Sequence, residues 1–126
     1  MLASKYRLKK KTNFARVEID GKLIQSTSFG MGIYDRSKDF NGENNNSESH
    51  FGFIISTKIS KKAVVRNRIK RVISEVIRKH LDIIKKGLDV VFLIKPSAAK
   101  LGKEELEKET YEIITKNLQI NSSISG

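Results

Sequence analysis

The chain has 126 residues, 38% of them hydrophobic, and its 25 lysines and arginines against 14 acidic residues give a formal charge of +11. This length fits one domain with a single core, and this charge predicts a polyanionic partner, either nucleic acid or an anionic membrane surface. The lack of cysteine excludes disulfides, thiolate metal sites and a cysteine nucleophile, and the apolar runs are too short to span a bilayer. The N-terminus lacks the apolar core of a secretory signal, so we expect a cytoplasmic protein.

A basic arm over residues 2–11 opens the chain, and a short helix is predicted after it. Thr12 or Asn13 is placed to cap that helix, and Gly21 is placed to end it. Two strands are predicted next, over residues 22–26 and 28–34, the second because apolar residues alternate along it. The cations of the arm include Arg7, Lys9, Lys10 and Lys11.

A polar, asparagine-rich segment over residues 36–50 interrupts this pattern. We interpret it as a loop inserted within the domain, because a run so poor in apolar side chains contributes little to a core. Residues 51–57, rich in Phe and Ile, predict a strand. Residues 89–95 predict another strand, buried on both faces and paired in parallel. Residues 103–118 predict an amphipathic helix whose solvent side is acidic.

The stretch between the last two strands, residues 58–81, is the most informative part of the chain. Its aliphatic residues recur at the spacing of one helix face, and cations occupy much of the remainder. The cations crowd toward the predicted start of the helix, where the macrodipole disfavours positive charge, so folding alone does not explain them. We expect this helix to end near Lys86, with Gly87 as its C-cap, and to bind a polyanion. Its polar groups include Lys58, Lys62, Arg66, Asn67, Arg68, Lys70 and Arg71.

No residue pattern predicts catalysis by protein groups. Neither His50 nor His80 pairs recognisably with Ser, Cys or a carboxylate, and no P-loop, HExxH or zinc spacing occurs. The basic helix leaves two interpretations open, a nucleic-acid contact surface or a solvated face that only maintains solubility. Clustering of one sign of charge favours the first, without separating RNA from DNA. Phe14, Phe29 and Phe53 are core candidates first, although aromatic residues beside cations also stack on unpaired bases.

The string KKAVVRNRIKRVISE resembles the signature of the bacterial ribonuclease P protein subunit, as do YRLKKKTNFARV and GFIIS before it and DVVFLIKP after it. The similarity covers roughly residues 5–118. It implies a single compact α+β domain in the order α-β-β-β-α-β-α. It also implies a mixed central sheet with a left-handed βαβ crossover around the basic helix, against the usual right-handed rule. We therefore expect one RNA-binding domain over residues 1–118 and a flexible tail over residues 119–126.

The resemblance also implies a function, which is to assist removal of the 5′ leader of precursor tRNA by a catalytic RNA. That RNA performs the hydrolysis with bound Mg²⁺, so no cofactor is expected on the protein alone. The expected partners are the catalytic RNA and precursor tRNA, and neither a membrane nor DNA. Carried onto this chain, the RNR residues of the basic helix bind the catalytic RNA, and the basic arm assists them. The leader lies in a cleft lined by Phe14, Val17, Phe29 and Phe53.

One alternative remains on the residues alone. The same basic helix suits a generic, ribosomal-type RNA-binding protein that has no role in cleavage. A nuclease that works without RNA is not favoured, because the chain offers no convergent catalytic groups.

Overall fold

The computed structural model describes residues 2–36, 48–55 and 62–118. The order α-β-β-β-α-β-α and the α+β class implied by the resemblance are confirmed, with two short 3₁₀ helices in addition. The elements are η1 (Ser4–Tyr6), α1 (Lys11–Asp20), β1 (Lys22–Gln25), β2 (Phe29–Asp35), β3 (His50–Ile54), α2 (Ala63–Lys79), β4 (Leu88–Ile94), η3 (Pro96–Lys100) and α3 (Lys103–Asn117).

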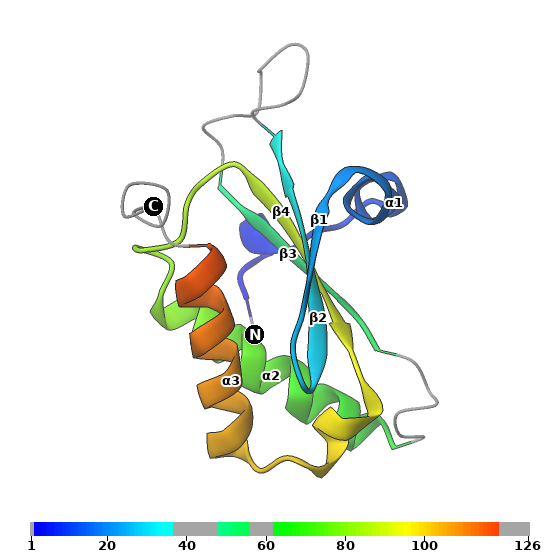
Figure 1. Ribbon diagram of the computed structural model, residues 1–126, viewed down its shortest axis with the longest axis vertical. Helices are drawn as coiled ribbons and strands as arrows, with labels where there is room; N and C mark the ends of the chain where they lie inside the picture. The colour runs from blue at the N-terminus through cyan, green and yellow to red at the C-terminus, as the bar shows by residue number, and fades with distance from the viewer. Residues whose placement is uncertain (1, 37–47, 56–61, 119–126) are drawn as a thin grey trace.

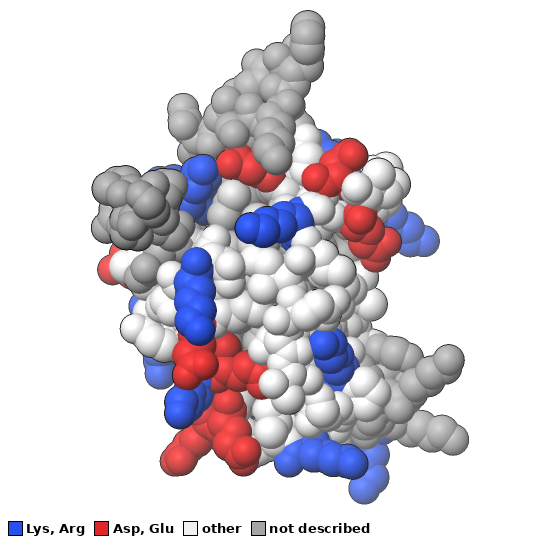
Figure 2. Space-filling view, in the orientation of Figure 1, with Lys and Arg blue, Asp and Glu red and all other residues white. Residues whose placement is uncertain are grey.

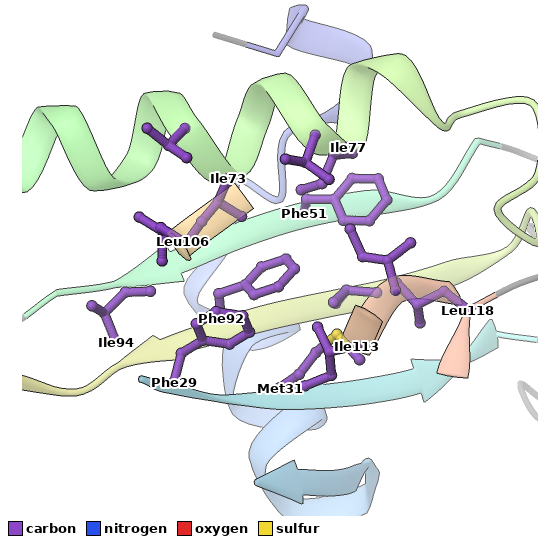
Figure 3. Packing of buried hydrophobic residues seen from close by; sticks show 14 of the residues in the cluster. Phe29, Met31, Phe51, Ile73, Ile77, Phe92, Ile94, Leu106, Ile113 and Leu118 are labelled. Atoms are coloured by element: carbon purple, nitrogen blue, oxygen red, sulfur yellow. The ribbon is translucent and has the colours of Figure 1, made fainter. Parts of the chain in front are cut away.

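The four strands form one mixed sheet in the order β1-β2-β4-β3. β2 pairs antiparallel with both β1 and β4, and β3 pairs parallel with β4, as the β-branched run of β4 predicted. Helices α2 and α3 cover one face of the sheet, and α1 lies on the other (Figure 1). Seen from the side of α2 with β3 and β4 pointing upward, β4 lies to the left of β3, so the crossover is left-handed (Figures 1 and 3).

The main core fills the space between the sheet and helices α2 and α3 (Figure 3). Phe29 and Phe92 have no exposed surface, and their rings meet edge to face with centroids 5.6 Å apart. The same core receives the aliphatic stripe of α2 and the buried side of α3, both of which the helical periodicity predicted. The stripe residues of α3 are Leu106, Ile113 and Ile114, with Leu118 directly after the helix.

The N-terminal arm is docked on the outer edge of β3. Arg7 forms an isolated parallel bridge with Phe51, and the backbone N–H of Leu8 donates to the Phe51 carbonyl at 2.9 Å. The side chain of Leu2 is buried in the main core. Leu8 joins a second, smaller cluster beneath α1, together with Val17, Tyr34 and Val91.

The predicted start of the first helix is wrong by two or three residues. α1 begins at Lys11 with Lys10 as its N-cap, and no side-chain hydrogen bond caps it, so neither Thr12 nor Asn13 has that role. Gly21 does end the helix, as predicted, and its N–H donates to the carbonyl of Val17.

The predicted end of the basic helix is also wrong. α2 ends at Lys79 with His80 as its C-cap, and it does not extend to Lys86. The chain turns there because Ile84 returns to the main core, where it is 3% exposed. Gly87, at φ 85°, lies directly before β4, so its left-handed conformation turns the chain into the strand and does not cap the helix.

The polar segment predicted as a loop over residues 36–50 is buried near both ends, and its last residue belongs to a strand. Arg36 and Ser49 are 3% and 5% exposed, and His50 is the first residue of β3. These polar groups are buried because each has hydrogen-bond partners, which composition does not reveal. Residues 37–47, Lys58 and the predicted tail over residues 119–126 lie outside the described residues.

Candidate nucleic-acid interface

Helix α2 is amphipathic, as its sequence predicted. Its first turn contains no acidic residue, and its N-cap, Lys62, makes no side-chain capping hydrogen bond. The positive end of the helix macrodipole and the cations of the first turns therefore act in the same direction on an approaching anion. Its buried residues are Ile69, Val72, Ile73, Ser74, Val76 and Ile77.

The RNR residues lie on the first half of α2, outside its buried stripe. Asn67 and Arg71 are exposed and the others are half-exposed. Within the described residues, no carboxylate lies within ion-pair distance of Arg68, Lys70 or Arg71. Arg68 instead donates from Nη1 to the backbone carbonyl of Leu101 at 3.2 Å. These three side chains are therefore cations that no carboxylate of the described residues neutralises as an ion pair.

The cationic surface of α2 ends at an ion pair between Glu75 and Arg78. Nε of Arg78 donates to Glu75 Oε2 at 3.2 Å, and a second guanidinium nitrogen donates to Oε1. The hydrogen bond from Arg78 holds the pKa of the Glu75 carboxyl below its usual value, and the same bond raises the pKa of Arg78. A groove of about 350 Å³ between α2 and α3 runs beside this pair and is lined also by Arg68 and Arg71.

Charge is segregated between the two helices that cover the sheet. Glu104 and Glu105 occupy the first turn of α3, where the helix dipole favours them. Figure 2 shows acidic side chains gathered over α3 on the face turned to the viewer. The acidic helix was predicted, and it leaves α2 as the more cationic of the two helices.

The four residues predicted to line a leader cleft do not share one surface. Phe14 and Val17 lie on the α1 side of the sheet, and Val17 is 2% exposed. Phe53 is half-buried on β3 and packs against the main core. Phe29 has no exposed surface and lies in the main core on the opposite face from α1, so its inclusion is wrong. The alternation of β2 turns Phe29 toward that core and turns Gly32 toward α1, where an added Cβ would lie 2.8 Å from Val17 Cγ1.

The α1 side of the sheet has an open apolar surface beyond the helix. In Figure 1, α1 crosses only one end of this side. Strand register places Leu23, Leu93 and Ile54 on it, from β1, β4 and β3 respectively. Leu23 is 54% and Ile54 is 38% exposed. The residue opposite Leu93 in β2 is Gly30, so this part of the face carries little side-chain volume.

The sequence analysis missed a buried cluster of charges centred on Asp89. The Asp89 carboxylate, 1% exposed, accepts hydrogen bonds from Arg36 Nη1 at 2.5 Å and from Arg16 Nη2 at 2.9 Å, and lies 3.2 Å from His50 Nδ1. The Arg16 guanidinium also lies over the ring of Tyr34, 4.4 Å from its centroid. One signal for this cluster was available, because an acid within a strand predicted to be buried on both faces requires partners.

The described residues offer no protein site for a metal ion. No group of three or more His, Cys, Asp or Glu side chains among them is arranged to hold one. Asp89 does not fit a magnesium site, because two guanidinium groups already bind its carboxylate and Mg²⁺ prefers oxygen ligands and water. In the same part of the chain, no helix has the length and apolar character needed to cross a membrane.

Known proteins resemble this chain over most of its length. The family model for Ribonuclease P matches residues 2–117. The ribonuclease P protein component of Cyanothece sp. is 31% identical over 123 residues, covering 91% of this chain and 94% of that protein. The corresponding protein of Microcystis aeruginosa is 36% identical over 112 residues, covering 88% and 89%.

Solved structures share the fold. The RNase P protein of Staphylococcus aureus matches with a TM-score of 0.76 at 22% identity, covering 87% of this chain and 93% of that one. The RNase P protein of Thermotoga maritima matches with a TM-score of 0.71 at 21% identity, covering 87% and 96%. With the fold shared, the family model matched and the relatives aligned along nearly their whole length, this chain belongs to the ribonuclease P protein family, as the protein subunit of an endoribonuclease involved in tRNA 5′ maturation.

Proposed function

We propose that this chain binds the catalytic RNA of ribonuclease P through α2 and holds the single-stranded leader of precursor tRNA on the α1 side of its sheet. The observation that carries this proposal is the first half of α2, where Arg68, Lys70 and Arg71 have no carboxylate within ion-pair distance among the described residues. Membership of the family implies association with the RNA of ribonuclease P.

The contacts of α2 with the catalytic RNA are electrostatic and bidentate. Guanidinium forks match the geometry of phosphate oxygens, and Asn67 adds an amide that both donates and accepts. The exposed cations of the N-terminal arm extend this surface as an auxiliary contact. The proposed residues on α2 and before it are Lys58, Lys62, Arg66, Asn67, Arg68, Lys70 and Arg71. Those of the arm are Arg7, Lys9, Lys10 and Lys11.

The leader contacts lie on and beside the open apolar face. Phe14 is half-buried on the α1 side, and Phe53 is half-buried at the β3 edge on the face of the main core, so each offers part of an aromatic ring to an unpaired base. Leu93 and Ile54 extend the apolar surface from Phe14 toward the far end of the sheet. Val17 supports this surface from beneath α1, since its side chain is buried against Gly32.

The chemistry of cleavage belongs to the RNA in this proposal. The catalytic RNA binds the Mg²⁺ that serves hydrolysis, and the protein contributes binding and orientation of the precursor. Neither a membrane nor DNA is a partner, and the assembly works in the cytoplasm.

A cleavage assay at low magnesium tests this function. Adding the protein to its cognate catalytic RNA should increase the rate of leader removal from precursor tRNA, because the protein adds contacts that the RNA alone lacks. A matched arm without catalytic RNA should give no cleavage. Absence of stimulation with a well-folded cognate RNA, or affinity for duplex DNA equal to that for precursor tRNA at matched salt, would contradict the proposal.

A further inference from the structure

The groove between α2 and α3 brings charges of both signs together. Contacts near its two ends set the register of the helices. Nη1 of Arg68 donates to the Leu101 carbonyl just before α3, and the rings of His80 and Tyr111 meet with centroids 4.9 Å apart. The two helices therefore run in the same direction (Figure 1), and their facing side chains line a groove of about 350 Å³.

The two carboxylates that line this groove differ in their partners. Glu75, on α2, is already held by the guanidinium of Arg78. Glu107, half-buried on α3, has neither a cation within ion-pair distance nor a side-chain hydrogen-bond partner among the described residues. Even Lys103, which lines the same groove one turn earlier on α3, forms no ion pair with it. The Glu107 carboxylate is therefore available to a ligand.

A carboxylate without a partner does not suit a surface that binds only phosphates. Arg68 and Arg71 line the α2 wall of the groove, so Glu107 meets any RNA that these cations attract. A phosphate beside Glu107 would repel it, and contact with the RNA removes part of its water. The carboxylate favours binding only if the RNA presents hydrogen-bond donors to it. In RNA these donors are the 2′-hydroxyls and the N–H groups of the bases, because phosphates only accept.

Among these donors, the Watson–Crick edge of guanine matches a carboxylate best. Its N1–H and N2–H groups lie side by side, so both carboxylate oxygens accept at once, as they do from an arginine fork. Adenine and cytosine each present one amino group beside a ring nitrogen that accepts, and uracil presents one N–H between two carbonyls. A 2′-hydroxyl offers a single donor. The chemistry of Glu107 therefore selects an unpaired guanine.

The groove also has the size and the apolar surface that a purine needs. An apolar cavity of about 150 Å³ accommodates benzene in a protein core, and this groove offers about 350 Å³. Val64, which is 76% exposed, and Val72, which is buried, both line it. The face of a base can therefore rest on aliphatic side chains while its edge reaches Glu107.

We propose that Glu107 reads one unpaired guanine of the catalytic RNA, bound in the groove between α2 and α3. Its two carboxylate oxygens accept hydrogen bonds from N1–H and N2–H of that base. The inference rests on the proposed function and deepens it. The cations of α2 supply affinity for phosphates of any sequence, whereas Glu107 selects the RNA that places a guanine at this point.

Interference by inosine in the assembled complex tests the proposal, because inosine is guanosine without the N2 amino group. Catalytic RNA that carries inosine phosphorothioate at random guanosine positions is mixed with the protein, bound and unbound RNA are separated, and iodine cleavage locates each inosine. We expect inosine at one unpaired position to be depleted from the bound RNA about tenfold to a hundredfold, the range that a hydrogen bond to a charged group provides.

A second arm places the same analogue in precursor tRNA and separates the two sources of RNA. Depletion in the catalytic RNA supports the proposal. Depletion only in the precursor would overturn the assignment to the catalytic RNA, and depletion at no unpaired position in either arm would overturn the inference as a whole.

Substitution of Glu107 connects the depleted position to the groove. Glu107→Gln replaces one accepting oxygen with an amide that only donates, so the native RNA should bind more weakly and the depletion at that position should disappear. The matched control is Glu104→Gln, which removes the same charge from an exposed residue of α3 that does not line the groove. It should retain the depletion and bind RNA at least as tightly as the native protein, because it only lessens repulsion.

Equal behaviour of the two glutamine variants would mean that Glu107 acts only as a negative charge, and the inference would be wrong. Thermal unfolding of both variants establishes that they are folded. If no inosine position responds while Arg71→Ala weakens binding of the catalytic RNA, the guanine inference is wrong and the proposed function stands. If Arg71→Ala also leaves binding unchanged in a folded protein, the proposed function is wrong as well.

Discussion

Arg16 and Arg36 converge on the buried carboxylate of Asp89, whereas Arg68 and Arg71 project from α2 without a carboxylate within ion-pair distance among the described residues. The side chain of Arg36 is 3% exposed, and Arg71 is an exposed residue. The same residue type therefore stabilises the fold in one region and remains available to a partner in the other. The nearest acceptor in three dimensions decides between these roles.

The two regions differ in how much stability the fold loses when one charge is removed. Around Asp89 the carboxylate and Arg36 are desolvated, and Arg36 uses further donors on the backbone carbonyls of Leu88 and Glu48. Removing one member of such a group leaves a buried charge or polar group without its partner. Removing a solvated cation from α2 leaves no buried group without a hydrogen-bond partner, because water solvates that cation in the free protein.

The largest expected effect is that of Asp89→Asn on stability. This change leaves two guanidinium groups next to a neutral amide, so we expect the free energy of unfolding to fall by about 3–5 kcal/mol. Urea denaturation measures it. The matched control is Asp35→Asn, because Asp35 forms an exposed ion pair with Lys85 at 3.1 Å, and it should cost about 1 kcal/mol or less. Equal losses for both variants would remove the distinction between the buried and exposed regions.

Within the buried cluster, replacing Arg36 should lower the free energy of unfolding more than replacing Arg16. Arg36→Met removes hydrogen bonds to Asp89 and to two backbone carbonyls, so we expect a loss of about 1.5–3 kcal/mol in urea denaturation. The side chain of Arg16 is 30% exposed, so water replaces part of what Arg16→Met removes and the loss should be smaller. A larger loss for Arg16 would mean that its contact with Tyr34, and not its charge, stabilises α1.

Local patterns in the sequence predicted those parts of the fold that depend on periodicity. The aliphatic spacing from Ile69 to Ile77 predicts the buried face of α2, and the β-branched run of β4 predicts a buried strand with a parallel neighbour. These patterns suffice because each is set by the face that a helix or strand must bury.

The errors concern residues whose role depends on distant neighbours. Arg36 belongs by composition to a polar loop, yet it is buried because Asp89 lies 53 positions away in the chain and beside it in space. Phe29 was assigned to a ligand surface, although the register of β2 with β4 turns it into the main core. Of the candidate site, the cationic half of α2 was predictable, whereas the division of the phenylalanines between the two faces of the sheet was not.

Two substitutions on α2, Arg71→Ala and Arg68→Ala, test whether its exposed cations bind RNA and contribute little to the fold. Both should weaken binding of the catalytic RNA by about 1–3 kcal/mol and lower the salt dependence by about one charge. Arg71→Ala should change the free energy of unfolding by no more than about 0.5 kcal/mol. Arg68→Ala also loses its hydrogen bond to the carbonyl of Leu101, so it should cost more stability than Arg71→Ala. Titrations at several salt concentrations and urea denaturation separate the two effects.

If both variants bind RNA as the native protein does while remaining folded, the cations of α2 do not form the contact surface. If Arg71→Ala destabilises the fold as strongly as Arg36→Met, the two regions do not differ as the comparison requires.

The smallest expected effect is that of Glu75→Gln, which tests the ion pair at the end of the cationic surface. The hydrogen bond from Arg78 lowers the pKa of Glu75 in the folded protein. A carboxyl whose pKa is lowered on folding contributes stability above its unfolded pKa, and that contribution disappears as the pH falls through its folded pKa. The native protein should therefore melt slightly higher than the Gln variant near neutral pH, and the difference should vanish in acid.

The difference should be small because the pair is solvent-exposed, and added salt should reduce it further. Melting temperatures of the native protein, Glu75→Gln and Arg78→Gln, measured from neutral to acid pH, check this. Both variants should show the same pH dependence, since the contribution requires both partners. A difference that persists in acid would mean that Glu75 stabilises α2 by packing, because charge is then absent. The comparison would then extend to carboxylates, with Asp89 acting through charge in the buried cluster and Glu75 acting through its side-chain stem at the surface.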